Sequence, residues 1–223
     1  MYSFKNNIWF PHPMDVDESG ILCIGGDLSV RRLLLAYQYG IYPWYNIEDP
    51  ITWWCPKPRY VIFPESVKVS KSMRSCFNMK KFEVTYNQGF DAVIRQCQRI
   101  KRKNQRGTWI SEAIIEAYTN LYHIGLATSV EVWNSQGQLA GGLYGVNIGK
   151  VFFGESMFSL ESNASKFGFI SLARQLEAED YMLIDCQQPN AHLESLGGEF
   201  ISGTDFYEIL HRNRLISLQS DLD

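Results

Sequence analysis

The stretch SVEVWNSQGQLAGGLYGVNIGKVFFGESMF, residues 129–158, decides the fold of this chain. It contains three runs of residues that favour strands, and two turn segments that contain Asn and Gly separate them. The runs cover 129–133, 138–146 and 151–158, and the turns cover 134–137 and 147–150. Runs of this kind, joined by such turns, predict a three-stranded antiparallel meander.

Helical patterns surround this meander, because apolar residues recur there with a period near 3.6. The expected elements are helices over 88–100, 111–124, 163–179 and 205–214, a strand over 181–184 and a short helix near His192. The order of helices, antiparallel meander, helix, strand and helix predicts a mixed α/β (α+β) domain on one central sheet, over residues 64–223.

Residues 1–63 have a different composition and predict a small, loop-rich N-terminal domain. Tryptophan, tyrosine, proline and glycine recur through this part of the chain. One helix is expected over 31–39, with Asp27 and Ser29 as candidate N-cap residues and Gly40 as the residue that ends it. Two domains, 1–63 and 64–223, are therefore expected.

The composition is typical of a folded globular protein and disfavours several other classes. Hydrophobic residues make up 45% of the 223 residues, and no apolar run reaches the roughly 18 residues of a membrane span. No leader-like segment opens the sequence, so a cytoplasmic protein is expected. Five widely spaced cysteines predict neither a disulfide framework nor a metal site. ATP and NAD have no support, because their glycine motifs are missing.

Candidate site residues occur where polar side chains end or interrupt strands. Asp185 directly follows the expected strand, and Gln187 lies two residues further, on the same side of an extended chain. The alternative makes Asp185 a helix cap and Gln187 a surface residue. Glu155 interrupts an apolar strand and is a candidate for binding a cation or an amine, unless the alternation of the strand points it to solvent.

A basic run indicates an RNA contact in a chain whose formal net charge is only −3. Its cationic residues are Arg99, Lys101, Arg102, Lys103 and Arg106. Such residues neutralise phosphates, and the indole of Trp109, three residues after the run, offers a stacking surface for an unpaired base. The alternative is a solvated helix end without a partner.

Several motifs together resemble one family, the bacterial leucyl/phenylalanyl-tRNA–protein transferases. They are GGDLS (25–29), GIYPW (40–44), DPITWWCP (49–56), GTWI (107–110), GGLYGV (141–146), GESMF (154–158), NASK (163–166) and IDCQ (184–187). The resemblance implies an aminoacyltransferase that moves leucine or phenylalanine, with methionine as a further option, from aminoacyl-tRNA to proteins with N-terminal Arg or Lys. It also implies that the added residue marks those proteins for degradation.

The same resemblance implies a fold and a set of partners. The C-terminal domain would have the fold of the GNAT acetyltransferases, and the enzyme would need no cofactor and no metal, because an aminoacyl ester is already activated. The stretch 159–164, which enters the helix after the meander, lacks the glycine-rich loop that would bind a coenzyme A pyrophosphate. A monomer is expected, because no apolar stripe is left over for self-association.

Roles in the reaction also follow from the resemblance. Gln187 would accept a hydrogen bond from the attacking amine, and Asp185 would polarise Gln187. Glu155 would help to bind the positively charged acceptor terminus. A neutral amide is a weak base, so the proton leaves through water or through the tRNA ribose, and both routes stay open.

Donor binding is expected to use aromatic and apolar side chains. Trp44 and Trp109 match family tryptophans at the tRNA 3′-adenosine, and Asn190 matches a position near the donor. The residues expected to line the pocket for the donor side chain are Leu143, Phe152, Phe169, Leu172 and Ile184. Two other interpretations stay open, an acyltransferase that uses acyl-CoA and a non-catalytic RNA-binding protein.

Overall fold

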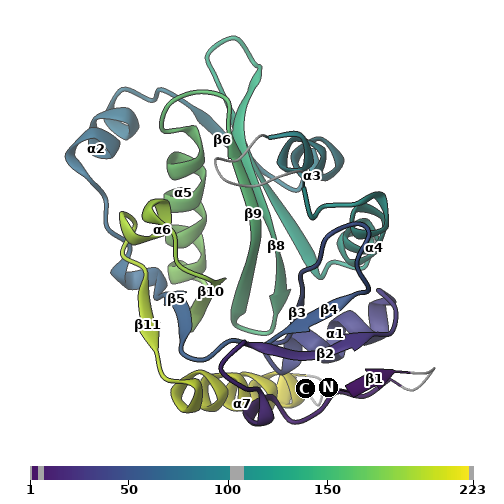
Figure 1. The fold of residues 1–223 in the computed structure, drawn as a ribbon. Helices are drawn as coiled ribbons and strands as arrows, with labels where there is room; N and C mark the ends of the chain where they lie inside the picture. Colours follow the sequence, from purple (N-terminus) through teal and green to yellow (C-terminus); the bar gives the residue numbers. More distant parts are fainter. Residues whose placement is uncertain (1, 5–7, 101–107, 221–223) are drawn as a thin grey trace.

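Two β-sheets organise the chain in the computed structural model, which describes residues 2–4, 8–100 and 108–220 (Figure 1). The smaller sheet has the strand order β1-β2-β4-β3, and the larger one has the order β11-β5-β10-β9-β8-β7-β6. The strands of the larger sheet are β5 (Arg59–Ile62), β6 (Glu83–Tyr86), β7 (Ala127–Trp133), β8 (Leu139–Ile148), β9 (Val151–Ser159), β10 (Leu183–Gln187) and β11 (Glu199–Ile201).

The predicted meander forms the middle of the larger sheet. β7 pairs antiparallel with β8, and β8 pairs antiparallel with β9. β10 then lies parallel to β9, with Leu183 opposite Val151, after the crossover helix α5 (Ala164–Ala178). The meander, the helix and the parallel strand are confirmed, and they make the central sheet a mixed one.

A glycine explains how β8 and β9 fit together. The pairing register shifts between Tyr144 and Gly145. A Cβ atom on Gly145 would lie only 2.3 Å from the carbonyl oxygen of Phe153 and 2.4 Å from the ring of Phe152. Only glycine permits this close approach, so the irregularity of the strand pair depends on Gly145.

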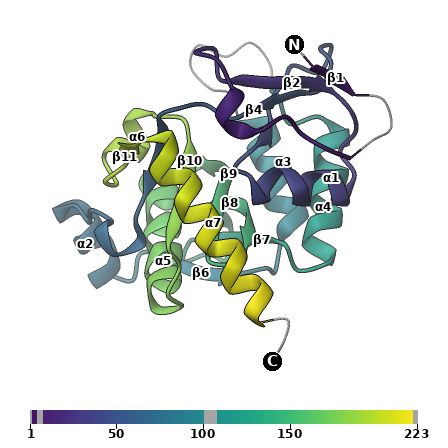
Figure 2. The ribbon, with the colours of Figure 1, turned by 90° about the horizontal axis from the view of Figure 1, so that it is seen from below.

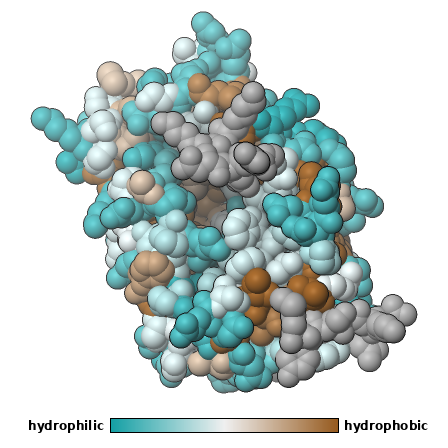
Figure 3. Space-filling model, viewed as in Figure 1, coloured by the Kyte–Doolittle hydropathy of each residue, from teal (hydrophilic) through white to brown (hydrophobic). Residues whose placement is uncertain are grey.

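Helices cover both faces of the larger sheet and create two cores. The short helix α2 (Lys71–Asn78) and α5 lie on one face, where Phe167, Ile170 and Val130 belong to one core. α3 (Phe90–Arg99) and α4 (Glu112–His123) lie on the other face, with Ile94 and Tyr118 in its core (Figure 1). The face drawn in Figure 3 is mostly hydrophilic, with brown apolar side chains in a few separate groups.

The N-terminal part of the chain contains a sheet that the sequence did not predict. Its strands are β1 (Tyr2–Phe4), β2 (Ile21–Gly25), β3 (Tyr42–Pro43) and β4 (Thr52–Trp54). The predicted helix is confirmed as α1 (Val30–Gln38), and the Ser29 side chain caps it by accepting a hydrogen bond from the Arg32 N–H. Gly40 follows with a φ of +70°, a conformation that favours glycine.

The expected boundary at residue 63 falls just after a strand of the larger sheet. β5 pairs with β10 and with β11, so the larger sheet includes four residues of the expected first domain. The division into 1–63 and 64–223 stays a prediction.

The C-terminal elements extend further than expected. β10 continues to Gln187, and the last helix, α7 (Gly203–Ser220), is longer than the expected 205–214. Figure 2 shows α7 crossing the molecule between α5 and α1. α6 (Ala191–Glu194) is the predicted short helix. None of the helices in the described part of the chain is both long and apolar enough to cross a membrane.

Candidate active site

A carboxylate with three hydrogen-bond donors lies at the centre of the candidate site. Glu155 on β9 is partly buried. Its Oε1 accepts hydrogen bonds from the Tyr37 hydroxyl over 2.7 Å and from Nε2 of Gln187 over 2.9 Å. Its Oε2 accepts one from the Tyr118 hydroxyl over 3.1 Å. Burial raises the pKa of Glu155 to about 7, although the bonds from the tyrosines and from Gln187 act in the opposite direction.

The two tyrosines come from distant parts of the sequence. Tyr37 lies on α1 and Tyr118 on α4, both are fully buried, and their hydroxyl groups are hydrogen-bonded to one another. Burial raises the pKa of both phenols well above its usual range, so both stay neutral donors. The two hydroxyls and the carboxyl group of Glu155 therefore form one hydrogen-bonded cluster.

Gln187 presents its amide to this carboxylate because the backbone bends there. The pairing of β10 with β5 shifts between Asp185 and Gln187, and Gln187 has a φ of +64°. Its backbone N–H donates a hydrogen bond to Oδ1 of Asp185 over 2.9 Å. Because its Nε2 donates to Glu155, the carbonyl oxygen Oε1 of Gln187 is the atom that can accept a hydrogen bond from an amine.

Asp185 is fully buried and forms a two-pronged ion pair. Nε of Arg59 lies 2.8 Å from Oδ1 of Asp185, and Nη2 lies 2.7 Å from Oδ2. Asp185 thus contacts the backbone N–H of Gln187, whereas the side-chain amide of Gln187 contacts Glu155. The polarising role that the resemblance gives to Asp185 stays a prediction, and Glu155 has the direct contact.

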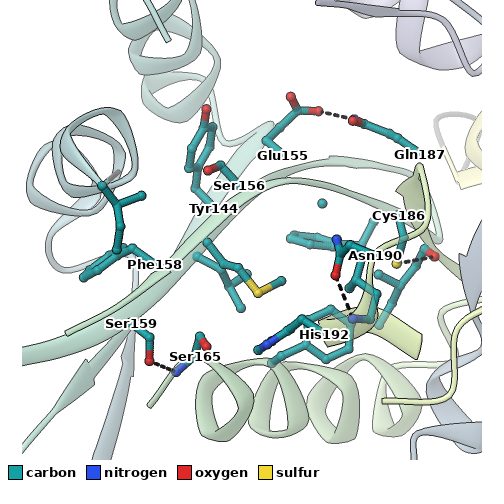
Figure 4. A pocket seen from close by; sticks show the side chains of 18 residues that line it. Tyr144, Glu155, Ser156, Phe158, Ser159, Ser165, Cys186, Gln187, Asn190 and His192 are labelled. Carbon is teal, nitrogen blue, oxygen red and sulfur yellow. Dashed lines mark hydrogen bonds between the residues drawn. The ribbon is translucent and has the colours of Figure 1, made fainter. Parts of the chain in front are cut away.

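A cavity of about 510 Å³ extends from this carboxylate and amide into the space between β9, β10 and α5. Four residues expected around the donor side chain line it, namely Leu143, Phe152, Phe169 and Ile184. Figure 4 shows Glu155 and Gln187 at one end and Ser159, Ser165 and His192 at the other. The apolar wall lies between these polar ends.

Two other expected donor residues lie in different positions. Asn190 lines the cavity and caps α6, since its Oδ1 accepts a hydrogen bond from the Leu193 N–H over 2.9 Å. Leu172 lies on α5, is 2% exposed, packs in the core and is not among the residues that line the cavity.

The expected RNA contacts are only partly within the described residues. Trp44 is 37% exposed and packs edge-on against Trp54, with 5.2 Å between the ring centroids. Trp109 is only 7% exposed and belongs to a core. Arg99 is exposed in the last turn of α3. Lys101, Arg102, Lys103 and Arg106 lie outside the described residues.

Sequence reasoning missed Tyr37, Tyr118 and Arg59. The tyrosines lie in helices whose period near 3.6 marks them as core residues, and no pattern distinguishes a core tyrosine from one that donates to a carboxylate. For Arg59 a signal existed, because a charged residue opens the apolar run of β5. Among the described residues, no group of three His, Cys, Asp or Glu side chains is placed to hold a metal ion.

The geometry of the site fits an acyltransferase that acts on an amine. The apolar cavity can hold an acyl group, and the amide carbonyl at its end can orient a nucleophilic amine toward that group. The neighbouring carboxylate fixes the amide and adds negative charge when it is ionised.

Comparison with known proteins defines the family. The family model "Leucyl/phenylalanyl-tRNA protein transferase" matches residues 61–211, and the model of the N-terminal domain of the same family matches residues 26–57. The leucyl/phenylalanyl-tRNA–protein transferase of Flavobacterium johnsoniae is 53% identical over 210 residues, which cover 94% of this chain and 99% of that protein. The chain belongs to the leucyl/phenylalanyl-tRNA–protein transferase family, and it is an aminoacyltransferase.

Two further proteins illustrate the range of similarity. The leucyl/phenylalanyl-tRNA–protein transferase of Christiangramia forsetii is 50% identical over 212 residues, covering 94% of this chain and 100% of that protein. A solved GCN5-related N-acetyltransferase from Kribbella flavida is 8% identical, with a TM-score of 0.37, and the match covers 75% of this chain and 59% of that chain.

Proposed function

We propose that this protein transfers leucine or phenylalanine, with methionine as a further donor, from aminoacyl-tRNA to the α-amino group of proteins that begin with Arg or Lys. The added residue then marks those proteins for degradation. The observation that carries the proposal is the contact between Gln187 and Glu155 at the end of the apolar cavity. The membership of the family supports both substrates.

Aminolysis of an aminoacyl ester needs a neutral amine in the correct position. An α-amino group has a pKa near 8, so a useful fraction is neutral at physiological pH. The Oε1 of Gln187 accepts a hydrogen bond from this amine and aims its lone pair at the ester carbonyl. The donation from Nε2 of Gln187 to Glu155 prevents the amide from turning around. Holding the two reactants in this geometry is the main source of the rate.

Glu155 also supplies the charge that a basic acceptor requires. The ionised form of Glu155 attracts a cationic terminus. Neutral hydrogen-bond donors from α1, α4 and β10 surround its carboxyl group. The raised pKa of Glu155, about 7, means that the ionised form dominates only above neutral pH. Acceptor binding therefore depends on pH near physiological values.

The donor side chain enters the apolar wall of the cavity. Leu143, Phe152 and Phe169 contact it there, and all three are almost fully buried. An apolar pocket of this kind discriminates only weakly between similar donor side chains, because one methylene group changes the binding free energy by only about 1 to 3 kcal/mol. Acceptance of both leucine and phenylalanine agrees with such a pocket.

The tRNA contacts use the cations of the basic run and an exposed indole. Trp44 has a free ring surface for the 3′-adenosine, whereas Trp109 acts mainly through packing. Arg99 neutralises phosphate together with Lys101, Arg102, Lys103 and Arg106. The reaction takes place in the cytoplasm, and the protein acts as a monomer.

The test is transfer of radiolabelled leucine from Leu-tRNA to two matched peptides that begin with Arg or with Ala. Label is expected on the Arg peptide alone, and Gln187→Ala is expected to lower the turnover while Leu-tRNA still binds. Label on both peptides would refute the acceptor rule. Binding of Leu-tRNA without any label would favour a non-catalytic RNA-binding protein, and transfer from acyl-CoA would favour the alternative donor.

A further inference from the structure

Arg59 is a fully enclosed charged side chain beside the site. It opens β5 and is fully buried. Besides the two bonds to Asp185, its Nη2 donates a hydrogen bond to the carbonyl oxygen of Gly40 over 2.8 Å. Its guanidinium carbon lies 4.9 Å from the centre of the Tyr42 ring and 4.7 Å from that of Phe206. Two rings and two strands therefore fix the guanidinium in place.

Stability alone does not explain this ion pair. Removing two charges from water is costly, and well-packed apolar residues often replace a buried pair with no loss of stability. The Asp185 carboxylate has a further contact that an apolar residue could not make, because its Oδ1 also accepts the backbone N–H of Gln187. Arg59 thus fixes the Asp185 carboxylate, and this carboxylate in turn fixes the backbone of Gln187.

The bend at Gln187 is the part of the site that needs such support. A φ of +64° is unfavourable for a residue with a Cβ atom, and it persists only where neighbouring groups enforce it. In this conformation the side chain of Gln187 reaches Glu155 on β9. An extended backbone would point the amide elsewhere, so the contact with Asp185 decides where the amide lies.

The same guanidinium also reaches the element that carries Tyr37. Gly40 follows α1, and its carbonyl oxygen accepts the bond from Arg59. Arg59 therefore connects the end of α1 with the end of β10, and each of these elements supplies one donor to Glu155.

We propose that Arg59 is a positioning residue for the transfer reaction and acts through Asp185: it fixes the carboxylate that holds the bend at Gln187. The proposal rests on the function proposed above for Gln187. No bond to Arg59 forms or breaks during the reaction. Its contribution is to the turnover, because it keeps the amide where the amine must bind, and it leaves the donor cavity unchanged.

The experiment compares Arg59→Met, Asp185→Leu and the double variant Arg59→Met/Asp185→Leu in the full chain. Melting temperature, kcat and KM are measured with Leu-tRNA and an Arg peptide. Each single variant leaves one buried charge without its partner and is expected to melt lower, whereas the double variant is expected to regain most of the loss. The kcat of the double variant is expected to stay about 100-fold low, as for a misplacement of about 1 Å. Its KM for Leu-tRNA is expected to remain within about twofold.

Two further variants make the result decisive. Arg32→Met removes another fully buried arginine, paired with Asp27 at 3.4 Å, and is expected to lower the melting temperature without changing kcat. Arg59→Lys keeps the charge but not the two-pronged geometry, and its kcat is expected to fall in a folded protein. If the double variant does not fold, the kcat of Arg59→Lys alone tests the role of Arg59.

The outcomes separate this proposal from the one on which it rests. Recovery of kcat together with melting temperature in the double variant, or a full kcat in Arg59→Lys, would overturn the role of Arg59. A full kcat in Gln187→Ala would overturn the role of Gln187 itself, and with it the reason for positioning it.

Discussion

Nε2 of Gln187 lies 2.9 Å from Oε1 of Glu155, and this contact joins the end of β10 to the middle of β9. Under the proposed function, it fixes which end of the amide faces the acceptor. It also couples the orientation of the amide to the protonation of the carboxyl group, because a carboxylate accepts the amide N–H more strongly than a neutral acid does.

The first prediction concerns the pH dependence of acceptor binding. Glu155 has a raised pKa of about 7, so it is neutral below that pH and ionised above it. A cationic acceptor prefers the ionised form, and its KM is therefore expected to fall as the pH rises through about 7. KM for an Arg peptide would be measured from about pH 6 to pH 8.5 at saturating Leu-tRNA, in the wild type and in Glu155→Gln.

The Glu155→Gln variant is expected to lose this fall in KM. Titration of the peptide's own amine affects both proteins equally and cancels in their ratio. Parallel pH profiles in the two proteins would contradict the assignment of the titration to Glu155.

The second prediction concerns Tyr37 and Tyr118. Each hydroxyl donates to Glu155 and lowers its pKa, so Tyr37→Phe and Tyr118→Phe are both expected to raise it. A hydrogen bond to a charged group is worth about 1.5 to 3 kcal/mol, which corresponds to a shift of about one pKa unit or more in the KM profile. Tyr122→Phe is the control, because Tyr122 also lies on α4 but donates to the carbonyl oxygen of Asn87. A shift of equal size in the control would refute the prediction.

The third prediction concerns donor preference. Phe169 lines the cavity, and Phe169→Leu leaves more room there. The ratio of kcat/KM for Phe-tRNA to that for Leu-tRNA is expected to rise, by about fivefold for a change of about 1 kcal/mol. Leu172→Ala is the control, because Leu172 lies in the core outside the cavity. It is expected to cost about 2 to 5 kcal/mol of stability and to leave the ratio unchanged.

The fourth prediction separates the two tryptophans. Trp44→Ala is expected to weaken the binding of Leu-tRNA by about 1 to 3 kcal/mol, the usual value of a stacked base, with little loss of stability. Trp109→Ala is expected to lower the melting temperature first, because its side chain is buried. Phe200→Ala, which removes an aromatic side chain that is 54% exposed on β11, serves as the control for tRNA binding in a filter assay. Unchanged tRNA affinity in Trp44→Ala would exclude Trp44 as a stacking surface.

The sequence predicted the parts of the fold that have clear periodicity. β7, β8, β9 and α5 are long, and their apolar patterns leave little ambiguity. β3 and β4 have only two and three residues, and proline occurs in or beside them, so no period could be read. β6 and β11 are also short, and both lie at edges of the larger sheet.

In the candidate site, Glu155 and Gln187 could be singled out because a polar residue interrupts or ends a strand there, and their roles stay predictions. Contacts between distant residues were not predictable. Tyr37 and Glu155 are 118 residues apart in the sequence, and Arg59 and Asp185 are 126 apart. Local sequence patterns carry no information on such pairs. The sequence therefore marked α1 and α4 only as core helices, and it gave Arg59 no partner.

The wide separation of the residues around Glu155 has a consequence for biosynthesis. Tyr37 leaves the ribosome early, whereas Gln187 is among the last part of the chain to be translated. Under the proposed function, a nascent polypeptide that has not yet reached β10 lacks the amide that orients the amine. Chains that end before β10 are therefore expected to be inactive.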